Sequence, residues 1–143
     1  KNQRELLNHF NKKKHKVKLN KFCYKDNEFI AEAEFEDFRW ERKIHLSDFH
    51  EIRIIDNVNS KAVSRFVLHP DIKVETINDN ELILKNGNYS WLFSSVNPVV
   101  VNDSIYSDQY GLKKNNRIIE INITAYNEIR LNNHVNPQFI ANM

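Results

Sequence analysis

The fold class is decided by residues 28–36, which read Glu-Phe-Ile-Ala-Glu-Ala-Glu-Phe-Glu. In an extended chain, successive side chains point to opposite sides, so Phe29, Ala31, Ala33 and Phe35 fall on one side and the glutamates on the other. This alternation is typical of a strand with one wet face and one core face. The segment predicts a β-strand whose four apolar side chains line the interior of the protein.

Similar short runs recur along the rest of the chain. We interpret as strands residues 12–19, 42–46, 51–58, 62–69, 72–77, 81–85, 89–94, 99–102, 117–124 and 128–131. Asparagine, proline and glycine stand between them, and Asn86-Gly87 is the strongest hairpin signal because a type I′ turn needs positive φ at both central residues. Since no segment predicts a long helix, we expect an all-β fold, an antiparallel β-sandwich of about ten short strands.

The two ends of the chain carry weaker patterns. Residues 1–11 have apolar side chains at helix-like spacing but are too few and too polar for a stable isolated helix, so we expect a loop or one packed turn. Residues 132–143 are rich in asparagine and are expected to fray. No linker or repeat divides residues 1–143, which predicts one domain, and the first residue, Lys1, suggests a processed or excised piece of a larger protein.

Composition excludes several classes of protein. The 143 residues are 41% hydrophobic and 28% charged, which excludes a disordered tail, and no run approaches the roughly 20 apolar residues of a membrane span. The formal net charge of +2 names no partner, and acidic residues interleave with the basic ones after Lys18, so we expect no nucleic-acid partner. Cys23 is the only cysteine, which excludes an internal disulfide, and its neighbours predict a strand with a buried thiol.

Histidines and serines are present, but their spacing assembles no catalytic set. Imidazole is the commonest metal ligand, yet His45 and His50 would fall on opposite faces of one continuous strand. His69 precedes Pro70, which is typical of the end of a strand. No serine lies in a strand-turn-helix context. We expect no catalytic residue, no metal ligand and no cofactor in this chain.

Two segments combine aromatic and polar side chains that suit a sugar. In the first, Trp40 could stack on a sugar ring while a neighbouring arginine holds an acidic group, because a guanidinium matches carboxylate and sulfate geometry. In the second, two tyrosines flank a polar stretch. The first could equally be an amphipathic strand start, and the second a surface loop. The carbohydrate-contact candidates are Arg39, Trp40, Arg42, Tyr106, Ser107 and Tyr110.

Four motifs follow one another in a characteristic order through about three quarters of the chain. They are Trp40-Glu41-Arg42-Lys43-Ile44-His45-Leu46, Ile52-Arg53-Ile54-Ile55-Asp56-Asn57-Val58, Phe66-Val67-Leu68-His69-Pro70 and Tyr106-Ser107-Asp108-Gln109-Tyr110-Gly111. A hairpin that carries Trp91 stands between the last two. In this order the motifs resemble the C-terminal β-sandwich of heparinase II/III-like polysaccharide lyases.

The resemblance implies a role that this chain would fill only together with another domain. Members of the family carry an N-terminal helical toroid that supplies the asparagine and tyrosine for β-elimination at a uronic acid, and nothing in this sequence corresponds to it. The likeness therefore implies an accessory β-sandwich, inactive alone, that packs on the toroid and forms one wall of a cleft for an acidic polysaccharide. It also favours a bacterial protein of the periplasm or the cell exterior.

Two other interpretations stay open. A stand-alone carbohydrate-binding or structural module would require Tyr106, Tyr110 and Trp40 to converge on one exposed surface. A metal-dependent enzyme would require the histidines to meet, which their spacing does not favour.

Overall fold

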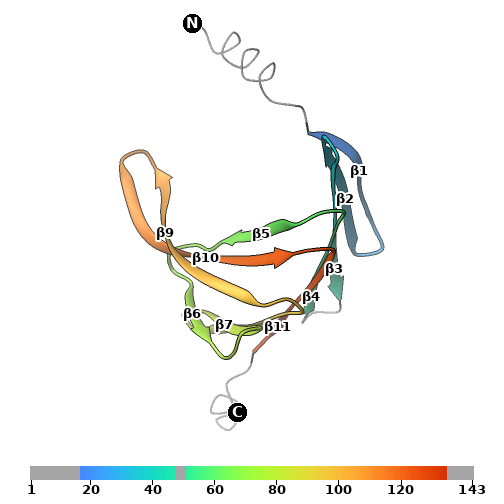
Figure 1. Ribbon diagram of the computed structural model, residues 1–143. Coiled ribbons are helices and arrows are strands. Elements are labelled where there is room, and N and C mark those ends of the chain that lie inside the picture. Colours follow the sequence, from blue (N-terminus) through green and yellow to red (C-terminus); the bar gives the residue numbers. More distant parts are fainter. Residues whose placement is uncertain (1–16, 48–50, 135–143) are drawn as a thin grey trace, which may run out of the picture.

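The computed structural model describes residues 17–47 and 51–134, and the regular elements of that part are all strands (Figure 1). They are β1 (Lys18–Lys25), β2 (Glu28–Phe35), β3 (Phe38–Ser47), β4 (Glu51–Val58), β5 (Ala62–Val67), β6 (Lys73–Thr76), β7 (Glu81–Asn86), β8 (Tyr89–Ser95), β9 (Val99–Gln109), β10 (Leu112–Ile123) and β11 (Tyr126–Asn133). The all-β prediction is confirmed. Among the described residues, no helix has the length and apolar character needed to cross a membrane.

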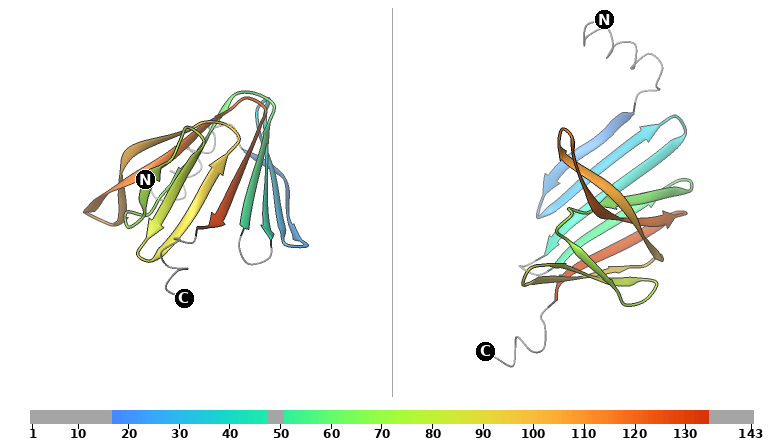
Figure 2. Two further views of the ribbon diagram at one scale, coloured as in Figure 1. Left: turned by 90° about the horizontal axis from the view of Figure 1, so that it is seen from below. Right: turned by 90° about the vertical axis from the view of Figure 1, so that its left-hand side faces the viewer.

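Two antiparallel sheets make up the fold, and they face each other as a sandwich (Figure 2). The large sheet has eight strands in the order β1-β2-β3-β4-β11-β8-β7-β6, and the small sheet has three in the order β5-β10-β9. Strands β1 to β4 pair in sequence order. Strand β11 pairs with both β4 and β8, and so joins strands β1 to β4 to strands β6 to β8 within one sheet.

The core lies where the small sheet covers the large one. Strand β10 supplies Ile119, Ile121 and Ile123, which are at most 2% exposed, whereas Glu120 and Asn122 between them face away from the core. Burying such a side chain contributes about 1.5–3 kcal/mol. The whole buried cluster draws on both sheets and comprises Val58, Leu68, Leu82, Phe93, Ile119, Ile121, Ile123 and Ile129.

The strand predicted for residues 28–36 is present as β2, but the prediction that its apolar side chains line the interior is only partly right. Pairing with β1 and β3 places Phe29, Ala31, Ala33 and Phe35 on one face. Ala33 is 7% exposed, whereas Phe29 is 37% and Phe35 38% exposed. The small sheet ends at its edge strand β5, which contacts β3, so the same face of β1 and β2 extends beyond the covering layer (Figure 2).

The prediction of a buried thiol is wrong. Cys23 lies in a strand, as expected, but its side chain is exposed. Strand β1 is the edge of the large sheet, and its register places Cys23 on the outer face, the face opposite Phe22 and Tyr24. A strand pattern predicts which side a residue faces, and says nothing of whether a layer covers that side.

One hairpin loop differs in detail from the turn prediction. The β7–β8 loop consists of Gly87 and Asn88, and only Gly87 has positive φ, at 60°. This is the pattern of a type II′ turn rather than the expected type I′. The type I′ pattern occurs instead between β1 and β2, where Asp26 and Asn27 have φ of 54° and 61°.

The largest difference from prediction concerns β9 and β10. Together they form one long hairpin, where the sequence predicted two short strands and a surface loop. Tyr106 lies within β9, and the turn is confined to Tyr110-Gly111, with Gly111 at φ 79°. The polar residues of this segment hid its strand character, because pairing across the hairpin satisfies its backbone without an apolar face. We call residues 103–116 the hairpin arm, which bends away from the body in Figure 1.

Some predictions fall outside the described residues. They concern residues 1–11, His50, most of the 12–19 strand and residues 135–143. Strand β11 continues to Asn133, so the prediction of fraying from Asn132 onward is wrong for these two residues.

Candidate functional site

The six carbohydrate-contact candidates divide between two distant parts of the molecule. Three lie in β3 and three on the hairpin arm, which sit toward opposite ends of the small sheet in Figures 1 and 2. The structure therefore does not bring Trp40, Tyr106 and Tyr110 onto one surface, as the stand-alone module required.

Arg42 forms an internal link between the two sheets. Its Nε donates to Asp56 Oδ1 at 2.7 Å and its Nη2 to Asp56 Oδ2 at 3.1 Å, and this carboxylate is 1% exposed. The same Nη2 lies 2.9 Å from Ser64 Oγ in β5. The guanidinium carbon also lies 5.5 Å from the ring centroid of Trp40 and 5.2 Å from that of Phe66. These contacts occupy the guanidinium, so Arg42 joins the sheets.

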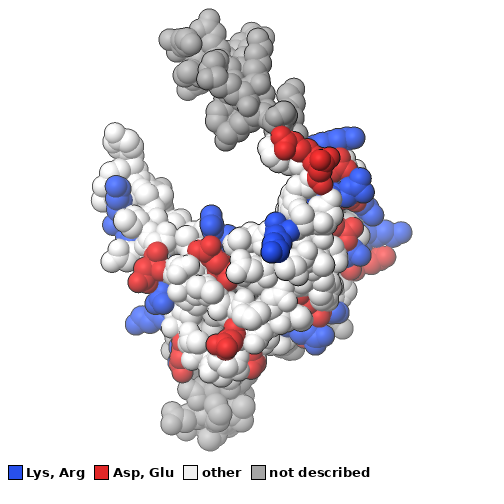
Figure 3. Space-filling model, in the orientation of Figure 1, with Lys and Arg blue, Asp and Glu red and all other residues white. Residues whose placement is uncertain are grey.

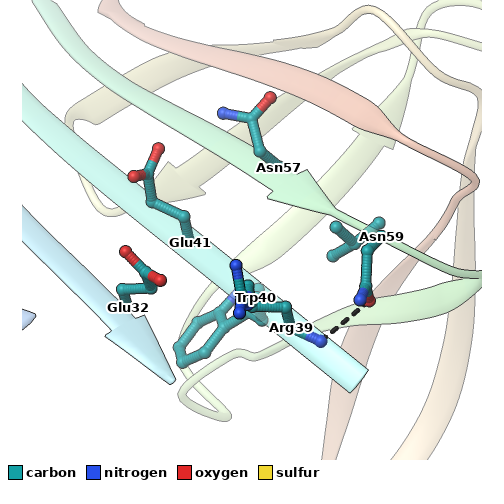
Figure 4. A pocket seen from close by; sticks show the side chains of 7 residues that line it. Glu32, Arg39, Trp40, Glu41, Asn57 and Asn59 are labelled. Carbon is teal, nitrogen blue, oxygen red and sulfur yellow. Dashed lines mark hydrogen bonds between the residues drawn. The ribbon is translucent and has the colours of Figure 1, made fainter. Parts of the chain in front are cut away.

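Arg39 lines a shallow hollow of about 260 Å³ on β3 and β4 (Figure 4). Its backbone N–H donates to Asn59 Oδ1 at 2.8 Å, and its guanidinium forms an ion pair with Glu34 at 2.9 Å. Glu32 and Glu41 add two carboxylates to the lining, so an acidic polysaccharide would meet more negative than positive charge here. The lining residues are Glu32, Arg39, Trp40, Glu41, Asn57, Val58 and Asn59.

The candidates on the hairpin arm differ in their freedom to bind. The Tyr106 ring packs against His69, with centroids 5.6 Å apart. The Ser107 hydroxyl lies 2.8 Å from the carbonyl oxygen of Gln109 and 2.7 Å from that of Leu112, so it supports the turn. Tyr110 is fully exposed at the tip of the arm. Of the three, Tyr110 presents a free ring to solvent.

A second hollow, of about 630 Å³, lies between the hairpin arm and the start of β6. We call it the arm hollow. Arg117 Nε is 2.9 Å from Asp103 Oδ1, and the Asn116 side-chain amide donates to the Leu68 carbonyl at 2.9 Å. The lining residues are Pro70, Ile72, Lys73, Val74, Asp103, Ser104, Asn115, Asn116 and Arg117.

The arm hollow combines groups that recognise sugars. Lys73 and Arg117 supply positive charge, Ser104 and Asn115 supply polar hydrogen-bonding groups, and Ile72 with its neighbours supplies apolar surface. Sequence reasoning missed this hollow, because Lys73 and Arg117 lie far apart in the chain and in different sheets, and only the tertiary fold brings their segments together. The polar triplet 115–117, just before an apolar strand, was the one available signal.

The histidines in the described part do not assemble with other ligands. His45 Nδ1 lies 3.8 Å from a Glu28 carboxylate oxygen. His69 Nδ1 accepts the backbone N–H of Asp71 at 3.1 Å. No group of three or more His, Cys, Asp or Glu side chains within residues 17–47 and 51–134 is placed to hold a metal ion.

A polar cluster occupies the outer face of the small sheet. Glu120 accepts a hydrogen bond from the Asn102 amide at 2.8 Å and another from the Arg65 guanidinium at 3.2 Å. These two donors, in that order, lower the pKa of the Glu120 carboxyl below its ordinary value. On the large sheet, a hydrogen-bonded ion pair with Glu128 raises the pKa of Arg53.

The comparisons with known proteins concern the family, through a family model, and the fold, through solved structures. The family model described as "Heparinase II/III-like, C-terminal" matches residues 2–136. Heparan sulfate lyase HepC from Pedobacter heparinus superposes with a TM-score of 0.66 at 11% identity, covering 85% of this chain and 22% of that one. The heparinase III BT4657 gene product gives 0.65 at 9% identity, covering 83% and 22%. A search among curated proteins found no match.

At these identities the structural likeness shows a shared fold, whereas the family match extends over nearly the whole sequence. This chain spans 22% of the length of each of these two solved lyase chains. The chain belongs to the heparinase II/III-like C-terminal family.

Proposed function

We propose that this chain is the accessory C-terminal β-domain of a heparinase II/III-like polysaccharide lyase. It packs on a helical toroid of the parent protein, forms one wall of the cleft for an acidic polysaccharide and performs no elimination alone. The observation that carries this proposal is the arm hollow, where Lys73 and Arg117 stand beside polar and apolar side chains on a family-matched fold.

The physical basis is electrostatic as well as steric. A uronate carboxylate or a sulfate gains charge-assisted hydrogen bonds from a guanidinium and an ammonium. Arg117 already pairs with Asp103, but Asp103 is 90% exposed, so water screens that pair. Tyr106, whose ring contacts His69, and Tyr110, at the tip, lie on the same hairpin arm that lines the hollow. The hollow on β3, with its carboxylates, is the less suitable surface.

The test is binding of heparan-type oligosaccharides to the full chain, measured by titration calorimetry. Lys73→Ala should weaken binding about tenfold, as expected for loss of one hydrogen bond to a charged group. Lys18→Ala in β1 is the matched control, since Lys18 is also exposed but lies outside both hollows. Binding should weaken as salt rises. Equal effects of the two substitutions would contradict the proposed site.

Catalysis is tested separately by the absorbance of unsaturated uronate products. The isolated chain should release none from heparan-type or alginate-type polymers. Turnover by this chain alone would refute an accessory role.

The three rings expected of a stand-alone carbohydrate-binding module do not share one surface, so the second candidate is a module that binds a glycan through Tyr110 alone, whose ring is fully exposed. That function predicts binding of neutral glycans that depends on Tyr110 and resists salt, because stacking on a ring needs no charge. Tyr110→Ala should then abolish binding, whereas in the lyase domain it should weaken binding less than Lys73→Ala.

A further inference from the structure

An apolar surface remains exposed where the large sheet extends beyond the small one. Strand pairing places Leu19, Phe22 and Tyr24 of β1 on the same face as Phe29 and Phe35 of β2. An irregularity between Leu19 and Lys21 keeps Leu19 and Phe22 on one side although they are three residues apart. These five side chains are 37–68% exposed. We call them the aromatic face.

The aromatic face is an ordered surface. Phe29 contacts Tyr24, with centroids 4.5 Å apart, and Phe22, with centroids 6.2 Å apart. The three rings are held by two paired strands, so a partner would not have to order them first. Side chains on the same sheet face continue without a break into Trp40 and Phe38 of β3, which pack against the core.

The opposite face of the same two strands has the character of a water-facing surface. Lys18 pairs with Glu34, Lys21 with Glu32 and Lys25 with Glu28, which sets opposite charges side by side across the strands. The two strands are therefore amphipathic, with the apolar side directed toward the covered part of the sandwich. A contiguous exposed apolar patch is typical of a surface that binds a partner.

We infer that the aromatic face is the surface on which an apolar layer of a longer parent polypeptide packs, an inference that rests on the proposed function as one domain of a lyase. The matched lyase chains are several times longer than this one, which covers 22% of each. Strand β1, the first strand described, carries three of the five side chains of this face. A second copy of the chain would be the competing occupant.

The experiment compares thiol reactivity on the two faces of β1, in this chain and in the polypeptide encoded by the complete reading frame. Native Cys23 reports the outer face, and Phe22→Cys or Leu19→Cys, each combined with Cys23→Ser, reports the aromatic face. In the longer polypeptide, maleimide labelling of the aromatic-face thiols should slow about tenfold or more, since burial requires a local opening of about 1.4 kcal/mol or more. Labelling of Cys23 should stay unchanged.

The outcomes separate this interface from the proposed function. Equal labelling of both faces in the longer polypeptide would overturn the interface alone, whereas the glycan titration with Lys73→Ala tests the function without reference to β1. A complete reading frame that adds no domain would overturn both. Sedimentation showing that the isolated chain dimerises, and that the aromatic-face thiols stay reactive in the longer polypeptide, would assign the face to a second copy. Similar labelling rates for Leu19→Cys and Phe22→Cys would show that neither substitution has altered the local structure.

Discussion

The two parts of the large sheet's inner face differ in burial although their sequence patterns are alike. On β11 and β7, Ile129 and Leu82 are at most 1% exposed beneath the small sheet. On β2, Phe29 and Phe35 occupy the same face of the same sheet and are more than a third exposed. Figure 3 shows the hollow that opens above the small sheet, between the hairpin arm and the side of the molecule formed by β1 and β2.

The difference shows that alternation and covering are separate properties. Alternation is a property of one strand, because each residue faces the side opposite its neighbours. Covering depends on the width of the second sheet, and three strands cannot cover eight. The apolar side chains of β1 and β2 thus alternate as core residues do, but they are exposed because no second sheet covers them.

The sharpest test of this comparison is truncation of one side chain in each part. Leu82→Ala should lower the free energy of unfolding by about 2–5 kcal/mol, since it leaves a cavity in a packed core. Phe29→Ala should cost about 1 kcal/mol, because its exposed ring already contacts water. Urea denaturation of the full chain measures both. Equal losses would mean that the aromatic face is covered within this chain.

A second test removes the hydrogen-bonded link that Asp56 and Arg42 form beside the edge of the small sheet. Asp56→Ala removes both carboxylate acceptors of the Arg42 guanidinium and leaves a partly buried charge whose remaining contacts, within the described part of the chain, are Ser64 and the rings of Trp40 and Phe66. We expect a loss of about 2–4 kcal/mol, somewhat less than for a fully buried pair because water reaches part of Arg42. A double substitution, Arg42→Met with Asp56→Ala, is the control and should recover part of the loss. No recovery would mean that Asp56 acts through other contacts.

The sequence was a good guide where one strand carried all the information. The alternation in residues 28–36 and the apolar run in residues 117–124 predicted strands that the structure contains, and the order of four motifs indicates the family that the comparison confirms. Sequence reasoning could not find the Arg42, Asp56 and Ser64 link, because its three members come from separate strands and meet only through tertiary pairing. Arg42 was therefore predicted as a sugar contact, although its hydrogen bonds lie inside the protein.

The candidate site was only partly predictable for the same reason. Tyr106 and Tyr110 were identified by residue type, and both lie on the hairpin arm beside the arm hollow or at its tip. Lys73 and Arg117 were not identified, because neither stands in a motif and each is surrounded by ordinary polar residues. A hollow between two hairpins has no signature within either sequence segment.

The hairpin loops offer a smaller test of how independently the two parts unfold. Gly87→Ala should cost about 1 kcal/mol of global stability, because its φ of 60° is unfavourable for a residue with a Cβ, and nothing lies within 4 Å to clash. Asn27→Ala places the same strain in the β1–β2 loop at φ 61°. We expect its effect mainly as faster amide exchange in β1 and β2, with little change in the urea midpoint. Identical global losses would show that β1 and β2 unfold with the core.

The smallest expected effect is a pH dependence of stability that arises from two carboxyl groups, those of Glu120 and Glu75. The pKa of Glu120 is lowered by hydrogen bonds from Asn102 and then Arg65, and the pKa of Glu75 by its hydrogen bond and ion pair with Lys85. A carboxyl whose folded pKa lies below its unfolded value stabilises the fold above that unfolded value, and the contribution disappears as pH falls through the folded pKa. The loss should therefore lie below the ordinary value of 4.5. Melting temperature against pH should fall less steeply there for Glu120→Gln than for the native chain, with Asn102→Ala intermediate, because it removes the first of the two donors. Parallel curves for all three would mean that Glu120 stays solvated and that its hydrogen bonds contribute nothing to the covering sheet.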